Sequence, residues 1–381
     1  MAEVSVVGAG MIPFGKYPDR SLVDLGAEAA FLAFKDSGLN PKEVDIAYFA
    51  NGFGGRLFGD FTIGQNVLWQ VGINRIPVVN VENACTSGST AFYLAYNSVA
   101  AEQVEIALAV GAEKMYVPEL GLLNSGQTEL DTQLGGVAPA SFAMRATRYL
   151  SEFDATPAQL AQVAVKNRGH AALNSMAQFR EAITVDEILA SPLIVDPLTR
   201  LMCCPNADGA AAVILASPAV ARRLGRAVRV NTALLFTGSY ENPQDQIRWE
   251  TDYRACQTAY EKTGIDPKDL DVAECHDAFT ISEILHYEAM GLCPTGEGAK
   301  LAAEGETALG GRIPVNTSGG LLSRGHPVGA TGIAQVLEIV TQLRQEAGNR
   351  QVEGARIGLS QCMGADKEGD TKSCTVAILS V

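Results

Sequence analysis

The chain has 381 residues, which exceeds the length of one average domain and predicts two domains. Hydrophobic residues make up 47% of it and charged residues only 19%, so the composition excludes a disordered protein. The net charge of -14 argues against nucleic acid and anionic membranes as partners, and no apolar run is long enough to span a bilayer.

Apolar, strand-like runs alternate with helical stretches along the chain. We expect strands at 4–7, 46–49, 106–110, 228–235 and 357–359, and helices at 22–36, 87–101, 157–171, 281–290 and 333–344. This alternation predicts an α/β architecture in which helices cover the sheets.

An internal repeat is the most informative feature of this pattern. Residues 36–53 align with residues 262–279, with Gly, Pro, Lys, Asp, Ala and Phe at matching places. In each copy a helix is expected to end at a glycine, Gly38 or Gly264, before a proline-containing turn and a short apolar strand. The chain is therefore predicted to consist of two homologous halves.

The segment between the two copies has a different character, because a Gly- and Pro-rich stretch is followed there by amphipathic helices. We interpret residues 117–191 as an insertion in the first half. The first half then comprises residues 1–116 and 192–224, and the second half comprises residues 225–381.

Cys85 follows a short apolar strand and a tight turn, directly before a helix of small residues. The free N–H groups and the dipole of a helix N-terminus favour a thiolate and bind an oxyanion. Such settings lower the pKa of a cysteine from about 8.5 to roughly 3.5–7.5. Cys85 is thus a candidate nucleophile, and a buried structural cysteine is the alternative.

His326 lies in a glycine-dense segment and is followed by Pro327 at the start of another helix. Proline at the first helical position fixes the backbone there and would hold the imidazole at the helix entrance. With only four histidines in the chain, His326 is a candidate general base. A capping or core histidine is the alternative.

His276 and Cys362 are each expected where a strand runs into a turn. His276 closes the strand of the second repeat copy, at a position where the first copy has Ala50. Strand ends are where α/β folds carry chemistry, although His276 would also suit a helix cap. Cys362 alone is a weak signal, and a core thiol is its alternative.

Other candidates are rejected. The glycines at 8 and 10 imitate a dinucleotide fingerprint, but Pro13 occupies the place of the third glycine. His170, on an expected surface helix, and His286 are interpreted as structural. No export signal is visible and the cysteines form no CxxC pair, so we expect a cytoplasmic protein with reduced thiols and no metal site. The remaining cysteines are expected to fill the core: Cys203, Cys204, Cys256, Cys275, Cys293 and Cys374.

In combination, these motifs resemble the thiolase superfamily along nearly the whole chain. The likeness is to the sterol-carrier-protein-type and the archaeal and bacterial thiolases, and its motifs are NACTSG at 83–88, PLTRLMCCPNADGAAA at 197–212, HDAFTISE at 276–283, NTSGGLLSRGHPVGATG at 316–332 and CMG at 362–364. The resemblance implies the thiolase fold, with two similar halves in a five-layered αβαβα arrangement and a loop domain inserted in the first half.

The resemblance also implies an acyl-CoA C-acyltransferase that cleaves or forms 3-oxoacyl-CoA. Cys85 would carry the acyl group, and His326 would activate its thiol. His276 would bind a thioester oxygen, and Cys362 would move the proton at the substrate α-carbon. Backbone N–H groups of Cys85 and Gly364 would form a second oxyanion hole.

The resemblance implies coenzyme A as a co-substrate and no permanently bound cofactor. A local excess of positive charge in the inserted segment suggests the site of the CoA phosphates, at Arg145, Arg148, Lys166 and Arg168. Related thiolases imply a homodimer, and a small OB-fold, zinc-ribbon subunit is a further expected partner. The sequence does not name the acyl group, and an aromatic or dicarboxylic 3-oxoacyl-CoA is an interpretation drawn only from relatives.

One departure from the family bears on the alternatives. Sterol-carrier-protein-type thiolases often have a cysteine where this chain has Ala278, so the proton-transfer role falls on Cys362 alone. The alternatives are acyl transfer to an acceptor other than CoA, retro-aldol cleavage in a complex with an OB-fold partner, and a non-catalytic scaffold. The presence of both Cys85 and Cys362 argues against the retro-aldolase, and the presence of all four reactive positions argues against the scaffold.

Overall fold

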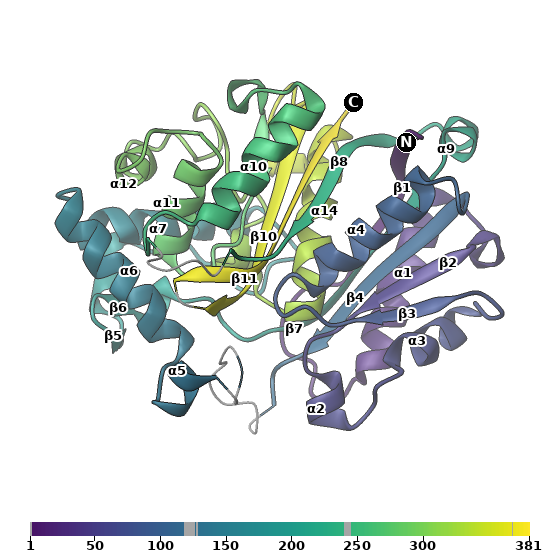
Figure 1. Cartoon of the computed structure of the whole chain (residues 1–381), viewed down its shortest axis with the longest axis horizontal. Coiled ribbons are helices and arrows are strands. Elements are labelled where there is room, and N and C mark those ends of the chain that lie inside the picture. The colour runs from purple at the N-terminus through teal and green to yellow at the C-terminus, as the bar shows by residue number, and fades with distance from the viewer. Residues whose placement is uncertain (1, 118–125, 127–128, 240–244, 368) are drawn as a thin grey trace.

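The computed structural model describes residues 2–117, 126, 129–239, 245–367 and 369–381. Nine strands of these residues form one mixed sheet in the order β3-β2-β4-β7-β1-β8-β11-β10-β9 (Figure 1). They are β1 Val4–Met11, β2 Ile46–Ala50, β3 Val78–Val81, β4 Ile106–Lys114, β7 Asp208–Ala216, β8 Val228–Phe236, β9 Val272–Glu274, β10 Ile357–Lys367 and β11 Asp370–Ser380. A separate two-stranded sheet pairs β5 (Leu193–Val195) with β6 (Leu198–Thr199).

Helices cover both faces of the large sheet (Figure 1). They are α1 Leu22–Ser37, α2 Gly54–Phe58, α3 Ile63–Val71, α4 Ser87–Ala100, α5 Leu130–Gln133, α6 Ala138–Glu152, α7 Pro157–Ala172, α8 Val185–Ala190, α9 Pro218–Leu224, α10 Glu250–Thr263, α11 Thr280–Ala289, α12 Gly298–Ala303, α13 Gly320–Arg324 and α14 Val328–Leu343. Short 3₁₀ turns lie at Pro41–Glu43, Arg200–Met202, Pro267–Asp269 and Gly348–Arg350.

The internal repeat is visible in the strand order. The first half of the sheet reads β2-β4-β7-β1, and the second half reads β9-β10-β11-β8 when it is followed from its own outer edge. Helices α1 and α10 both end at a left-handed glycine, with φ of 73° at Gly38 and 71° at Gly264. Each glycine is followed by a 3₁₀ turn with a capping box. Antiparallel pairing of β1 with β8 joins the two halves into one sheet.

The side chains of each strand alternate between two cores, which produces a layered molecule. Helices α4 and α14 share one core with residues from both halves of the sheet. Helices α1 and α3 cover the opposite face of the first half, and α10 and α11 cover the opposite face of the second half. The predicted αβαβα thiolase fold is therefore confirmed, with the two β layers continuous through β1 and β8.

Glycines allow α4 and α14 to pack closely at the centre. A Cβ added to Gly332 would lie 2.5 Å from the backbone nitrogen of Ser89, and one added to Gly88 would lie 2.7 Å from the carbonyl oxygen of Gly329. Any larger residue at these positions would force the helices apart. This close approach brings the N-termini of α4 and α14 together. A predicted site residue lies just before each of these two helices in the chain.

The inserted segment carries α5 to α8, and α6 and α7 pack against the core beneath α10 and α11. Residues 118–125 and 127–128 of the predicted insertion lie outside the described residues, and its boundaries stay a prediction. His170 on α7 is buried, so the expectation of a surface helix is wrong for this face of α7. Within the described parts of the chain, every helix is too short or too polar to cross a membrane.

Candidate active site

Cys85 lies in the turn between β3 and α4. The hydroxyl groups of Thr86 and Ser87 donate to the carbonyl oxygens of Asn83 and Ala84, each at 2.6 Å, and fix this turn. Burial raises the pKa of the Cys85 thiol to about 11, although backbone N–H groups of Ala365 and of Cys85 itself act in the opposite direction. The expectation that the helix N-terminus lowers this pKa is therefore wrong, because desolvation of the thiolate outweighs the N–H groups.

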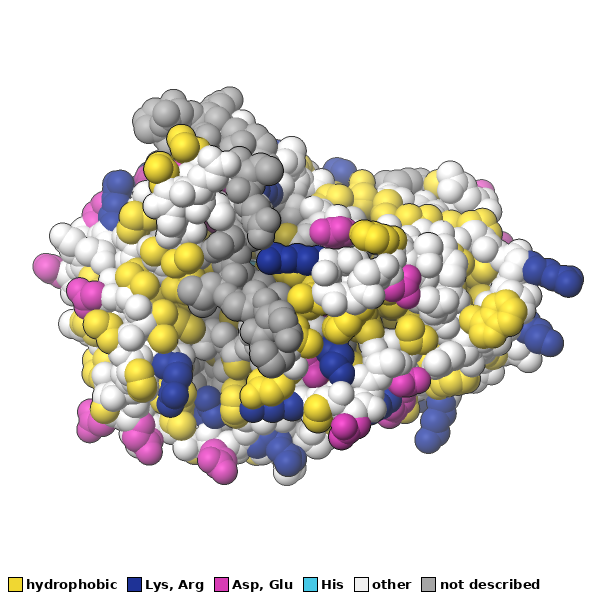
Figure 2. Space-filling model, turned by 90° about the horizontal axis from the view of Figure 1, so that it is seen from below, with side chains coloured by type: hydrophobic (Ala, Val, Ile, Leu, Met, Phe, Trp, Pro, Cys, Tyr) yellow, Lys and Arg dark blue, Asp and Glu magenta, His cyan; other side chains and the backbone are white. Residues whose placement is uncertain are grey.

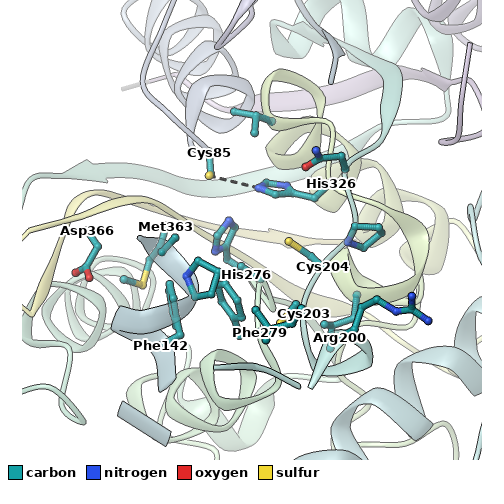
Figure 3. A pocket seen from close by; sticks show the side chains of 18 of the residues that line it. Cys85, Phe142, Arg200, Cys203, Cys204, His276, Phe279, His326, Met363 and Asp366 are labelled. Atoms are coloured by element: carbon teal, nitrogen blue, oxygen red, sulfur yellow. Dashed lines mark hydrogen bonds between the residues drawn. The ribbon is translucent and has the colours of Figure 1, made fainter. Parts of the chain in front are cut away.

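His326 is placed to take the proton of Cys85. Its Nε2 lies 3.3 Å from Cys85 Sγ (Figure 3), and its Nδ1 lies 2.7 Å from the hydroxyl of Thr331. That hydroxyl donates its single proton to the carbonyl oxygen of Pro327, so it accepts a hydrogen bond from Nδ1–H. Nε2 therefore presents its lone pair to the thiol. Burial, with the charge of Arg324, lowers the pKa of His326 to about 3, so the imidazole is neutral.

Cys362 lies beside His276 because β9 and β10 run parallel, and its thiol also lies against the Cys85 turn. Ser360 pairs with Glu274 across these strands, so Cys362 and His276 each lie two residues further on, at the same edge of the sheet. The thiol of Cys362 lies 3.3 Å from the carbonyl oxygen of Cys85. Burial and the neighbouring Cys85 raise its pKa well above the ordinary value, so Cys362 carries a proton in the resting site.

Gly364 lies against the Cys85 turn, at a place that has no room for a side chain. A Cβ at this position would meet the Ser373 hydroxyl oxygen at 2.5 Å, and the Asn83 carbonyl and Thr86 hydroxyl oxygens at 2.9 Å. The absence of a Cβ thus allows β10 to approach the turn that carries Cys85.

His276 completes the group. Its ring centroid lies 5.2 Å from that of His326, and the donor atoms of Cys85, His276 and His326 all lie within 4.8 Å of one another. Its Nε2 is buried and has no hydrogen-bond partner among the described residues. Burial, with smaller effects of His326 and His286, lowers its pKa well below the ordinary value. A neutral imidazole with an unpaired ring nitrogen is suited to bind a substrate oxygen.

Three of the four predicted residues, Cys85, His276 and His326, line one cavity of about 860 Å³ (Figure 3). Cys362 is fully buried behind its wall, against the carbonyl oxygen of Cys85. Aromatic and aliphatic side chains form most of its wall, which is usual for a small-molecule site. Cys203 and Cys204 also line this chamber, so the expectation that they fill the core is wrong for these two cysteines. Two adjacent cysteines do not by themselves indicate a place in a chamber. The position follows from the fold, which brings residues 200–206 to the strand ends.

Comparison with known proteins agrees with this geometry. The thiolase N-terminal domain family model matches residues 4–219, and the thiolase C-terminal domain-like model matches residues 241–380. The chain belongs to the thiolase family. It is a thiolase-type acyl-CoA acyltransferase.

Individual relatives cover nearly all of this thiolase. The acetyl-CoA acetyltransferase of Methanothermobacter thermautotrophicus is 37% identical, over 96% of this chain and 97% of the relative. A subunit of the benzoylsuccinyl-CoA thiolase of Thauera aromatica is 36% identical, over 95% of this chain and 94% of the relative. Among solved structures, the Ltp2-ChsH2(DUF35) aldolase is 26% identical with a TM-score of 0.82, over 100% of this chain and 98% of that chain.

Behind His276 lies a buried network that sequence reasoning missed. The carboxylate of Asp252 lies 2.6 Å from His286 Nδ1 and accepts a hydrogen bond of 2.9 Å from the Gln361 amide. His286 Nε2 lies 3.0 Å from the carbonyl oxygen of His276, and the Gln361 amide oxygen accepts from the His276 backbone N–H at 3.1 Å. Asp252 thus holds the His276 carbonyl group through His286 and the His276 backbone N–H through Gln361. The prediction of a structural role for His286 fits this position.

The four predicted phosphate-binding cations lie in different surroundings. Arg145 is buried in an ion pair with Asp366, and Lys166 is buried in an ion pair with Glu283. Arg148 is exposed and pairs with Glu152. Only Arg168 lines the chamber, where its guanidinium lies 4.8 Å from the centre of the Phe179 ring.

Arg200 also lines the chamber and was missed by the sequence reasoning. Neither Arg168 nor Arg200 forms an ion pair within 4.0 Å in the described part of the structure. Desolvation lowers the pKa of Arg168, so burial destabilises its charged form and an anionic partner would stabilise it.

Proposed function

We propose that this thiolase cleaves 3-oxoacyl-CoA thioesters with free CoA, or forms them by the reverse Claisen condensation, through an acyl-Cys85 intermediate. One observation carries the proposal: the Cys85 thiol lies 3.3 Å from a neutral, buried base, and a second protonated thiol lies against the same turn. A nucleophile with its base and a separate acid is the set that cleavage of a C–C bond next to a thioester requires.

In the first half of the reaction, His326 takes the proton of Cys85 as the sulfur attacks the 3-keto carbon. The C2–C3 bond then breaks, the acyl group stays on Cys85 as a thioester, and the bond electrons pass to the acetyl-CoA enolate. Cys362 donates its proton to C2 of that enolate, which leaves as acetyl-CoA. The enzyme then holds acyl-Cys85, a Cys362 thiolate and the His326 imidazolium.

The second half of the reaction restores both thiols. The Cys362 thiolate takes the proton of the incoming CoA thiol, whose sulfur attacks the acyl-Cys85 carbonyl carbon. The C–S bond to Cys85 breaks, and His326 returns its proton to the departing Cys85 sulfur. Acyl-CoA leaves, and no proton or electron pair is left over.

Two oxyanion sites serve these steps. The unpaired Nε2 of His276 is proposed to bind the thioester oxygen whose charge rises in the enolate. Backbone N–H groups of Cys85 and Gly364 are proposed to bind the oxygen of the tetrahedral intermediate on Cys85. Loss of one such fixed donor typically costs about 10²–10³ in rate.

Coenzyme A is proposed as the co-substrate, with its phosphates at Arg168 and Arg200. The support for this assignment is that both guanidinium groups lie at the chamber, whereas Arg145 and Lys166 are buried in ion pairs with carboxylates. The expectations of no resident cofactor, no metal and a cytoplasmic location stay predictions.

A homodimer is proposed as the working unit. Large apolar side chains are exposed beside the edge strand β3, with Phe61 79% and Trp69 78% exposed. Yellow hydrophobic surface is visible on the right-hand part of Figure 2, over the half of the molecule that holds α2 and α3 in Figure 1. A small OB-fold subunit is a second proposed partner, supported by the DUF35 component named with the aldolase relative.

Intact-protein mass spectrometry tests the proposed reaction. The chain and its Cys85→Ser variant are exposed to a panel of 3-oxoacyl-CoA thioesters. An acyl adduct on the unmodified chain and none on the variant is the expected result. The aldolase alternative is tested with a 3-hydroxyacyl-CoA, the β-hydroxy thioester that retro-aldol cleavage requires. Cleavage of it to an aldehyde or ketone and an acyl-CoA, with no adduct from any 3-oxoacyl-CoA, would support that alternative and contradict the proposed reaction.

A further inference from the structure

We propose that the chamber selects 3-oxoacyl thioesters whose acyl group carries an uncharged aromatic ring. This inference rests on the proposed thiolase reaction and names the group that Cys85 accepts. It is carried by two features of the chamber. One is a wall of aromatic rings, and the other is that, among the residues that the structure describes, the cation beside that wall is already paired with a carboxylate.

Three segments that are far apart in sequence build the aromatic wall, which consists of Phe142, Trp249 and Phe279. The Phe142 and Phe279 rings are stacked, with centroids 4.3 Å apart and planes 24° apart. Trp249 meets Phe142 edge to face at 6.0 Å. All three line the chamber, so a ring of the substrate would extend an existing stack.

The aromatic wall faces the catalytic groups. In Figure 3, Phe142, Met363 and Asp366 lie on one side of His276, and Arg200 with Cys203 lies on the other. A thioester whose phosphates lie near Arg200 therefore directs the acyl end of the substrate toward the aromatic wall. A two-carbon acyl group on Cys85 would leave this side of the chamber unfilled.

Charge at the aromatic wall decides between an aromatic and a dicarboxylic acyl group. The cation behind the wall is Arg145, which lies 5.2 Å from the Phe142 ring centre and 5.3 Å from that of Trp249. Its guanidinium is only 1% exposed and is bound to both carboxylate oxygens of Asp366. Asp366 lines the chamber and already neutralises this cation, so a substrate carboxylate would find no free positive charge to pair with there.

The test compares three thioesters in the thiolysis reaction with free CoA: 3-oxo-3-phenylpropanoyl-CoA, acetoacetyl-CoA and 3-oxoadipyl-CoA. We expect kcat/KM for the phenyl thioester to exceed that for acetoacetyl-CoA by about tenfold or more, as two ring contacts predict. The dicarboxylic thioester is expected to be the poorest of the three.

Two variants locate the source of the preference. Phe142→Leu keeps an apolar side chain but removes one ring of the aromatic wall, and is expected to lower kcat/KM about tenfold for the phenyl thioester only. Phe179→Leu removes a ring beside Arg168 in the same chamber and serves as the matched control. Its effect is expected to be the same on all three thioesters, because all three carry CoA.

The possible results separate the inference from the proposed function. Turnover with acetoacetyl-CoA or 3-oxoadipyl-CoA equal to or above that with the phenyl thioester would overturn the inference and leave the proposed function intact. An equal loss on all three thioesters in Phe142→Leu would also overturn it. Absence of turnover and of any acyl-Cys85 adduct with all three would overturn the proposed function, and the inference with it.

Discussion

Cys85 and His326 are expected to be both uncharged in the resting enzyme. With a pKa of about 11, the thiol is ionised in about one molecule in 10⁴ at pH 7. Moving its proton to His326, whose pKa is about 3, costs roughly 11 kcal/mol before the two charges attract each other. Their attraction at 3.3 Å returns roughly 5 kcal/mol at an effective dielectric constant of about 20. The proton is therefore expected to move during attack on the substrate.

Alkylation of Cys85 by iodoacetamide between pH 6 and pH 10 measures this directly, with peptide mass spectrometry to identify the site. The rate at pH 7 is expected to be about 10²-fold below that of a free cysteine, and to rise about tenfold per pH unit without a plateau. In His326→Ala the alkylation profile is expected to keep this slope. Acylation of Cys85 by a 3-oxoacyl-CoA is expected to fall by about 10²–10⁴ in the same variant.

A different alkylation profile would refute this account. If the rate in the unmodified enzyme reached a plateau with an apparent pKa between about 5 and 8, and His326→Ala removed that plateau, the resting site would hold a thiolate–imidazolium pair. The burial of both groups would then not control their protonation. Cys85→Ser, which cannot be alkylated in this range, shows that the signal comes from this residue.

Three further substitutions follow from the same geometry. Cys362→Ala is expected to slow the exchange of α-carbon hydrogens of acetyl-CoA in D₂O by about 10²–10⁴, measured by NMR, while the alkylation rate of Cys85 stays unchanged; loss of both would mean that Cys362 only supports the fold. Thr331→Val leaves the buried Nδ1–H of the base without an acceptor, and should lower kcat about 5- to 100-fold with little change in KM; unchanged kcat would contradict the tautomer assigned here. Asp252→Asn breaks a buried charged network and should lower the unfolding free energy by about 3–5 kcal/mol in denaturant titrations. The matched control for it is Glu152→Gln, in an exposed pair worth about 0–1 kcal/mol, and equal losses in the two variants would contradict the prediction.

Several elements extend beyond their predicted limits for identifiable reasons. The strand predicted at 357–359 continues to Lys367, because pairing with β11 satisfies the backbone of polar residues that lack a strand-like pattern. The helix predicted to begin at Ile333 begins at Val328. Glycines at 329 and 332 weaken the helical signal, yet close packing against α4 requires them. Local sequence propensity predicted each of these elements to be shorter than it is, because tertiary contacts determine where the element begins or ends.

The sequence by itself determined the repeat, the family and the four side chains that meet in the site. Those features reside in motifs whose spacing is visible along one chain, such as the two copies at 36–53 and 262–279. Only the tertiary structure decided the protonation of Cys85, the network of Asp252 behind His276, and the arginines that reach the chamber. Each of these depends on desolvation or on contacts between segments more than 20 residues apart, and such contacts leave no local pattern in a sequence.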